Sequence, residues 1–217
     1  MGNCSEKVVF MQCIVIFGIQ GSGKGTQAKL LSESLGYQHV NIGDLLRDQV
    51  SRGTELGNEV KAVIARGELV EDELIFRLIA NAIQANAKGI VFDGFPRTEA
   101  QAEHLGRHFT VRKVFYLDLS EEEAISRIGA RRVCQSCGEN FNLNSKKPAK
   151  EGVCDRCGGK LGIRQDDRPE AIRKRMIEFY AQTQGLTSWF EAHGLLARID
   201  AGKSVEAVFR ILMEGVS

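Results

Sequence analysis

Short apolar runs alternate along this 217-residue chain with longer stretches in which apolar residues recur every three or four positions. The short runs are almost continuously apolar, which is typical of strands that are covered on both faces in a parallel sheet. They predict five strands, at residues 13–17, 38–41, 90–93, 113–118 and 195–200. Strands that alternate with helices predict repeated strand-helix-strand units, and therefore an α/β fold with a five-stranded parallel sheet flanked by helices.

The longer stretches predict helices at residues 23–35, 98–108, 120–130 and 204–213. Gly36 follows the first of them, at the position where glycine commonly ends a helix. Ser120 and Glu123 form a capping-box pattern at the start of the third, with an acidic first turn that complements the helix dipole.

Two segments interrupt this rhythm. Residues 42–70 are polar and helical and contain four glycines that we expect to break the helix: Gly43, Gly53, Gly57 and Gly67. Residues 131–168 hold paired cysteines, lysines and clustered glycines. We therefore predict a core domain (residues 11–41, 71–130 and 169–217) with two insertions, at 42–70 and 131–168, placed where ligand loops sit in open parallel sheets.

Charge and hydropathy exclude some classes of protein. The formal net charge is +1, so no global field attracts nucleic acid or an anionic membrane. No apolar run approaches the roughly 20 residues of a spanning helix, and we expect a cytoplasmic protein. The first residues fit the N-myristoylation pattern except at Glu6, where a hydroxyl is required, and we interpret residues 1–10 as an N-terminal extension.

A glycine-rich stretch, IFGIQGSGKGTQ at residues 16–27, follows the first predicted strand and opens the first predicted helix. Gly18, Gly23 and Lys24 fall in the register of the phosphate-loop pattern, but the hydroxyl arrives one position late, at Thr26. In this strand-loop-helix context backbone N–H groups and the helix N-terminus favour an anion, and the lysine adds a mobile positive charge. The stretch predicts a phosphate-binding loop.

Four of the six cysteines form two C-x-x-C pairs separated by sixteen residues: Cys134, Cys137, Cys154 and Cys157. Two such pairs at this separation predict a closed four-thiolate site for structural zinc. Iron could use the same ligands, and disulfides are the alternative in an oxidising compartment.

Several further motifs follow in order: GDLLR at residues 43–47, DGFPRT at 93–98, RRVC at 131–134, RQDD at 164–167 and RKR at 173–175. Together with GSGKGTQ at residues 21–27, they resemble the adenylate kinase family in its form with a long, zinc-bearing lid. The resemblance covers essentially the whole chain from about Met11 onward. It implies a phosphate-loop kinase fold in which residues 42–70 bind the monophosphate and residues 131–168 (the lid) close over the site.

The resemblance also implies functional residues. The ATP site would comprise Gly21, Ser22, Gly23, Lys24, Gly25, Thr26, Arg127, Arg131, Asn140, Phe141 and Lys203. The AMP site would comprise Ile42, Arg47, Glu68, Leu69, Val70, Gly94, Phe95, Pro96, Arg97, Gln101, Arg164 and Arg175. The catalytic set would be Lys24, Arg97, Arg127, Arg131, Arg164 and Arg175, with Asp93 holding magnesium through water.

The chemistry of phosphoryl transfer agrees with this set, because bringing anionic phosphates together requires positive charge and positioning, which arginine forks supply. The implied reaction is reversible transfer from MgATP to AMP, giving two ADP, by a monomer with no nucleic-acid or membrane partner. We interpret five other arginines as surface charges: Arg52, Arg66, Arg77, Arg107 and Arg112. Asp44 is a candidate helix cap, and the four histidines lack metal-like spacing.

Two departures from the family pattern bear on function. Gln20 stands where the family usually has proline, and Ile42 where it has a threonine beside the base, preceded by Asn41 in place of serine. Isoleucine cannot hydrogen-bond adenine, so base selection would rest on the amide of Gln101. A UMP/CMP kinase is the alternative within the class, although Thr98 stands where those enzymes carry asparagine; a zinc-ribbon nucleic-acid-binding module is a more distant one.

Overall fold

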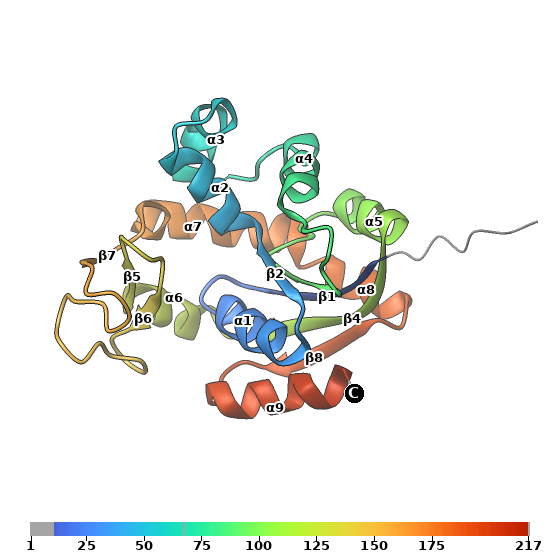
Figure 1. Ribbon diagram of the computed structural model, residues 1–217. Helices are drawn as coiled ribbons and strands as arrows, with labels where there is room; N and C mark the ends of the chain where they lie inside the picture. The colour runs from blue at the N-terminus through green and yellow to red at the C-terminus, as the bar shows by residue number, and fades with distance from the viewer. Residues whose placement is uncertain (1–10, 67, 217) are drawn as a thin grey trace, which may run out of the picture.

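The computed structural model describes residues 11–66 and 68–216, and a five-stranded parallel sheet forms its centre (Figure 1). The strands are β1 (Met11–Gly18), β2 (Gln38–Asn41), β3 (Ile90–Asp93), β4 (Phe109–Asp118) and β8 (Leu196–Asp200). Their order across the sheet is β2-β3-β1-β4-β8, and every neighbouring pair is parallel. The five predicted strands are confirmed, and β4 begins four residues earlier than the apolar run suggested.

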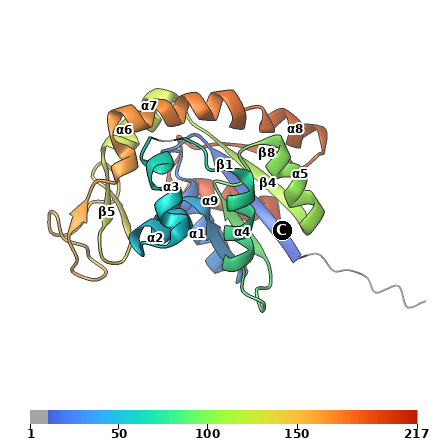
Figure 2. The ribbon, with the colours of Figure 1, turned by 90° about the horizontal axis from the view of Figure 1, so that it is seen from above.

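Helices cover both faces of the sheet, because successive side chains of each strand point to opposite sides. Ile14 and Ile16 of β1 pack on one face beneath α1 (Lys24–Leu35) and α9 (Val205–Val216). Val15 and Phe17 point to the other face, which carries α5 (Glu99–His108), α7 (Pro169–Glu178) and α8 (Leu186–Ala192). Figures 1 and 2 show these two layers on either side of the sheet.

The first insertion contains α2 (Ile42–Ser51) and α3 (Glu55–Arg66), and α4 (Asp72–Ala82) follows it. Of the predicted helix breakers, Gly53 lies between the two helices with φ of 62°, as expected. Gly43 and Gly57 lie inside helices, so their prediction as breakers is wrong. Gly57 is needed for packing instead, since a Cβ there would collide with the backbone of Gln49 in α2. Gly67 lies outside the described residues.

The lid leaves the core after α6 (Glu121–Gly129) and holds a second, antiparallel sheet in the order β6-β5-β7. Its strands are β5 (Arg131–Cys134), β6 (Asn140–Asn142) and β7 (Leu161–Gly162). The buried centre of the lid is small and consists of Cys134, Phe141, Cys154 and Leu161. The chain returns to the core through a 3-10 turn (Gln165–Asp167), α7, a π-helical turn (Phe179–Thr183) and α8.

Side chains cap several of the helices. Thr98 accepts a hydrogen bond from the backbone N–H of Gln101, and Ser120 from that of Glu123, so both residues lie just outside the helices that they begin. The expectation that Asp44 caps α2 is wrong. The side chain of Asn41 is the cap and accepts the backbone N–H of Asp44 at 2.8 Å.

Within the part of the chain that the structure describes, no helix is both long and apolar enough to span a bilayer. The predicted extension at residues 1–10, and with it the myristoylation pattern, lies outside the described residues.

Candidate active site

The phosphate loop joins β1 to α1 at the carboxyl end of the central strand of the sheet. Gly21 has φ of 87°, and a Cβ there would lie 2.6 Å from the carbonyl oxygen of Ala124, so the loop fits against α6 only as glycine. Gly23 begins α1 in a left-handed conformation. The buried hydroxyl of Ser22 has no hydrogen-bond partner in the protein, which suits a loop built to receive an anion.

Lys24 folds across this loop. Its Nζ donates hydrogen bonds to the carbonyl oxygens of Gly18 at 2.7 Å and Ile19 at 2.8 Å. Burial lowers the pKa of Lys24 to about 7, an effect that Asp93 opposes and Arg97 reinforces. The ammonium group therefore has a strong electrostatic preference for a nearby phosphate, which would restore its pKa.

Asp93 lies at the end of β3, directly beside the loop. Its buried carboxylate accepts a hydrogen bond from the Asn41 side chain, and His39 Nε2 lies 3.4 Å from the same oxygen. A Cβ at Gly25 would lie 3.2 Å from that oxygen, so a larger residue at position 25 would crowd the acid. Where the phosphate-loop pattern has a hydroxyl residue, this loop has Gly25, which leaves space for the Asp93 carboxylate. Carboxylate oxygens are ligands suited to magnesium or to its bound water.

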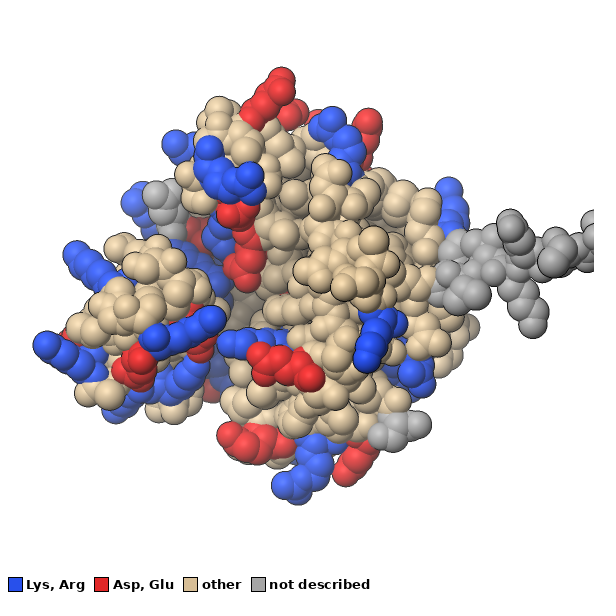
Figure 3. All heavy atoms as spheres, in the orientation of Figure 1, with Lys and Arg blue, Asp and Glu red and all other residues tan. Residues whose placement is uncertain are grey.

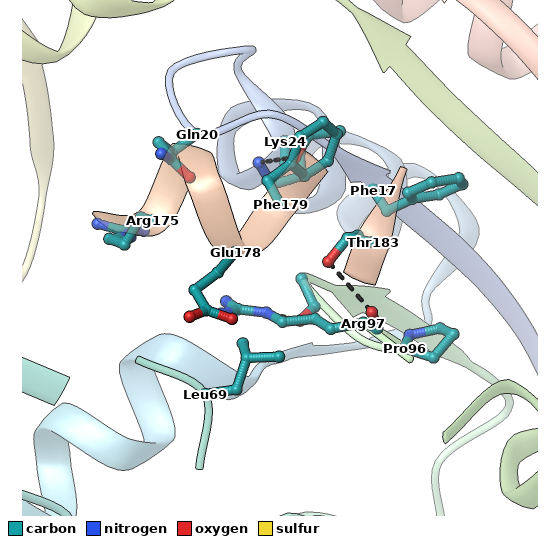
Figure 4. Close-up of a pocket in the computed structure, with 12 residues that line it drawn as sticks. Phe17, Gln20, Lys24, Leu69, Pro96, Arg97, Arg175, Glu178, Phe179 and Thr183 are labelled. Atoms are coloured by element: carbon teal, nitrogen blue, oxygen red, sulfur yellow. Dashed lines mark hydrogen bonds between the residues drawn. The ribbon is translucent and has the colours of Figure 1, made fainter. Parts of the chain in front are cut away.

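Arg97 faces the loop from the turn between β3 and α5, and it lines the same pocket as Lys24 (Figure 4). Its Nε donates to the carbonyl oxygen of Gly94 at 2.9 Å, and its backbone N–H donates to Gln101 Oε1 at 2.8 Å. Burial lowers the pKa of Arg97. Among the described residues no carboxylate oxygen lies within 4.0 Å of either the Arg97 guanidinium or the Lys24 ammonium.

The other arginines of the site are held by carboxylates. Asp166 accepts from Arg175 of α7 at 3.0 Å and from Arg47 of α2 at 3.2 Å, so it joins the first insertion to the end of the lid. Burial alone would raise the pKa of Asp166, but Arg175 and Arg47 outweigh it and hold the value below the ordinary range. Burial lowers the pKa of Arg175 to about 10.

Two arginines come from the lid itself. Arg131 donates two hydrogen bonds to Asp167, one of them at 2.8 Å, and Arg164 donates to Asn140 Oδ1 at 2.9 Å. Burial, together with the charges of Arg47 and Arg131, lowers the pKa of Arg164 to about 10. Figure 3 shows lysine and arginine side chains gathered where the lid meets the body of the molecule.

The structure places some residues of the expected ATP site away from this pocket. Arg127 donates to the carbonyl oxygen of Ala201 at 2.9 Å, two residues from Lys203, whose side chain is exposed. Asn140 is exposed on the lid, whereas Phe141 is 3% exposed and packs with the cysteines. Thr26 is exposed on the first turn of α1. Contacts of Phe141 with a nucleotide would therefore involve its backbone rather than its ring.

Several residues of the expected AMP site are buried in the core or already bonded to other residues of the protein. Ile42 is 3% exposed and belongs to the main apolar core. Gln101 is also buried, and its amide is used on both sides, because Nε2 donates to Asp72 Oδ1 at 2.6 Å while Oε1 accepts from Arg97. Leu69 lines the pocket, Val70 is buried, and Glu68 forms an ion pair with Arg66 at 2.7 Å. Phe95 packs in the core, while Gly94 and Pro96 line the pocket.

Some pocket residues were missed by the sequence analysis. Glu178, Phe179 and Thr183 line the pocket from the helical run that follows the lid, and Asp72 contacts Gln101 from α4. Arg175, Glu178 and Phe179 have the spacing of one helix face, which is a signal that the sequence carried. Thr183 lies in a π-helical turn, which has no comparable pattern. The five arginines interpreted as surface charges are all exposed.

The four lid cysteines converge, as their spacing predicts. Their Sγ atoms all lie within 4.8 Å of one another; Cys134 and Cys157 are 3.4 Å apart, and Cys137 and Cys154 3.7 Å. None of the four forms a disulfide. Four sulfurs at about 2.3 Å from one zinc ion would be separated by about 3.8 Å in a tetrahedron. The donor set therefore fits zinc, and the sulfur–sulfur distances differ from the tetrahedral value by no more than about 1 Å.

The fold and the site together define a phosphate-loop nucleotide-binding protein with a cysteine-bearing lid. The family model "Adenylate kinase" matches residues 16–195. An adenylate kinase of Treponema denticola is 42% identical over 200 residues, covering 91% of this chain and 95% of that protein. Adenylate kinases of Caldicellulosiruptor saccharolyticus and Methanocella arvoryzae are each 40% identical, over 84% and 89% of this chain and 88% and 93% of their own lengths. The chain belongs to the adenylate kinase family, which confirms the resemblance.

Proposed function

We propose that this protein transfers the terminal phosphoryl group of MgATP to AMP, reversibly, giving two ADP. The observation that carries the proposal is the pair of cations without carboxylate partners, Lys24 and Arg97, on opposite sides of one pocket. One belongs to the phosphate loop and the other to the β3–α5 turn. Two nucleotides bound in this pocket could thus bring their phosphates together between Lys24 and Arg97.

Each part of the site would have a distinct task. Backbone groups of Gly21, Ser22, Gly23, Gly25 and Thr26, with Lys24, would hold the triphosphate, and Asp93 would hold the magnesium ion through water. Arg97 and Arg47 would bind the monophosphate. Magnesium would neutralise charge on the transferring group when bound, while the protein groups hold that group in line.

Arg131, Arg164 and Arg175 would neutralise the phosphoryl group during transfer. All three are partly buried, and each contacts an acidic or amide oxygen of the lid or its exit. These contacts keep the partly buried guanidinium groups in place, so they need not reorganise when charge develops on the phosphoryl group. Arg127 and Lys203 lie near the β8–α9 turn and would contact the adenosine end of ATP, together with Asn140 and the backbone of Phe141.

The insertions would move the substrates into contact. Residues 42–70, including Ile42, Glu68, Leu69 and Val70, would enclose AMP with Phe95, Pro96 and Gln101, and residues 131–168 would close over ATP and exclude water. Structural zinc held by the four cysteines would keep the lid folded. We further propose a monomer in the cytoplasm, where thiols remain reduced.

A coupled assay that offers AMP, CMP, UMP and GMP in parallel with MgATP tests the proposed reaction. AMP should be the preferred acceptor; preference for CMP or UMP would favour the pyrimidine kinase alternative instead. The variant Arg97→Met should raise the KM for AMP roughly tenfold to a hundredfold, the equivalent of one charged hydrogen-bonded contact. Arg107→Met, on the exposed side of α5, is the matched control and should leave the KM unchanged.

A further inference from the structure

Arg97 is fixed from three directions. Its guanidinium donates to Gly94, its backbone N–H donates to Gln101, and its backbone carbonyl oxygen accepts a hydrogen bond from Thr183 Oγ1 at 3.1 Å. The Thr183 contact joins residues that are 86 positions apart in the sequence. It is the contact that ties the Arg97 turn to the helical run leading out of the lid (Figure 4).

The π-helical turn determines which side chain makes that contact. Gln184 N–H donates to the carbonyl oxygen of Phe179, so this turn holds one residue more than an α-helical turn. In an uninterrupted α-helix, eight residues advance by about 80° beyond two full turns, so Thr183 would lie about 80° to one side of Arg175. The additional residue turns it back by about 100°, to within about 20° of Arg175. Both side chains consequently reach the pocket.

Neighbouring residues confirm that the face has shifted. Gln182 would occupy this face if the helix were uninterrupted, yet it is exposed and bonds Glu178 Oε2 at 2.8 Å. Thr183 is 6% exposed, and its hydroxyl has the Arg97 carbonyl as its partner. A π turn is less favourable than an α turn and often marks a functional position.

We infer that Thr183 is a positioning residue for Arg97, and that the π-helical turn serves to place its hydroxyl on the Arg97 carbonyl. This inference rests on the proposed function, in which Arg97 binds the phosphate of the acceptor nucleotide. The hydroxyl touches no reacting atom. It holds the peptide of Arg97 so that the guanidinium faces Lys24 across the pocket, and a small displacement of such a group reduces the rate severely.

The experiment compares three variants of the full-length protein. Thr183→Val keeps the shape and removes the hydroxyl, whereas Thr183→Ser keeps the hydroxyl. Thr187→Val is the matched control, because Thr187 is also 6% exposed, lies in the same helical run and donates its hydroxyl to a backbone carbonyl, that of Gln184, at 2.8 Å. Each valine variant removes one buried hydroxyl–carbonyl bond, but only Thr183→Val releases Arg97.

Thr183→Val should lower kcat/KM for AMP by about fivefold or more, with the KM for MgATP changed less than about twofold. Thr183→Ser should restore kcat/KM for AMP to within about twofold of the unmodified protein, and Thr187→Val should leave it unchanged. Thermal midpoints should fall by similar amounts in the two valine variants.

Three results would overturn the inference: unchanged AMP kinetics in Thr183→Val, an equal loss in Thr187→Val, or a failure of serine to rescue. The proposed function is tested separately by the unmodified protein. If that protein does not phosphorylate AMP, the proposed reaction is wrong irrespective of the variants. If it does, the comparison of Thr183 with Thr187 decides the positioning role alone.

Discussion

Arg131 and Asp167 face each other across the base of the lid, with Arg131 Nε 2.8 Å from Asp167 Oδ2 and a second hydrogen bond beside it. The two residues lie 36 positions apart, one at the start of β5 and the other at the end of the 3-10 turn. Asp167 has 1% of its side chain exposed and Arg131 has 19%. This ion pair therefore joins the two chain segments that enter and leave the lid, and it orients a guanidinium of the proposed site.

Asp167→Ala should lower the free energy of unfolding by roughly 1.5 to 3 kcal/mol, because it removes a charged hydrogen-bonding partner and leaves a partly buried cation unpaired. Urea denaturation measures the change. Asp48→Ala is the control: it breaks the exposed pair with Arg52, in which both side chains are more than half exposed, and should cost less than about 1 kcal/mol. Equal losses in the two variants would show that the Arg131–Asp167 pair contributes no more than a surface pair.

The fold was largely predictable because its signals are local. Apolar runs identified the five strands, and glycine or serine at the helix ends identified several boundaries. The extension of β4 back to Phe109 was missed, since Phe109–Lys113 alternates in exposure and lacks a continuous apolar run. Gly57 was misread because a glycine needed for close helix packing looks the same in sequence as a glycine that ends a helix.

The sequence indicated which residues belong to the candidate site, but not how they are arranged or paired. The motifs indicated Lys24 and the arginines, and the structure brings Lys24, Arg97 and Arg175 to one pocket. The sequence could not show which cations are paired, because Asp166 and Asp167 reach Arg47, Arg175 and Arg131 only through the tertiary fold. For the same reason it could not show that Gln101 is engaged on both sides of its amide.

Asp166 should make the protein sensitive to acid. Because Arg175 and Arg47 hold its pKa below the ordinary aspartate value despite burial, the folded state favours the charged form. Its contribution to stability is thus complete above the unfolded-state pKa of about 3.9 and is lost as the pH falls through the lower folded-state value. Urea denaturation from pH 6 to 3 should show a shallower loss of stability in Asp166→Asn than in the unmodified protein. Parallel curves would contradict this assignment.

Lys24 should take up a proton when a triphosphate binds. With a pKa of about 7 in the free protein, most of the lysine is neutral at pH 8, and an adjacent phosphate would return it to the charged form. Titration calorimetry in buffers of different ionisation enthalpy should therefore show a net uptake of protons on nucleotide binding at pH 8. Lys24→Arg, which keeps a permanent charge, should abolish the uptake; an uptake that persisted in this variant would assign the proton to another group.

Ile42 offers a test of base recognition. Because Ile42 is buried in the main core, Ile42→Val should lower the free energy of unfolding by about 0.5 to 1.5 kcal/mol. Ile42→Thr has the shape of the valine variant and adds a hydroxyl. If that hydroxyl reaches the base, the KM for AMP should be lower in Ile42→Thr than in Ile42→Val by the equivalent of one neutral hydrogen bond, roughly 0.5 to 1.5 kcal/mol. Equal Michaelis constants would place recognition of the base elsewhere, and Gln101 is then the residue to test.

Removal of metal should unfold the lid while leaving the central sheet intact. Apart from the four ligands, the described residues of the buried lid centre are only Phe141 and Leu161, too little apolar surface to order this segment without a crosslink. A chelator, or the double change Cys134→Ser and Cys137→Ser, should abolish the hydrogen-exchange protection of residues 131–162 and preserve that of β1 and β3. Enzymatic activity should fall together with the protection of the lid, because Arg131 and Arg164 would lose the contacts that hold them in place.

Cys13→Ala is the control for the zinc experiment, since Cys13 is a fully buried cysteine of β1 outside the cluster. It should lower global stability but leave the bound zinc, measured by elemental analysis, at one ion per chain. Protein purified under reducing conditions without zinc would contradict the metal site. Retention of lid protection, thermal midpoint and ATP turnover after complete stripping would show that the lid folds without metal and that the four thiols serve another purpose.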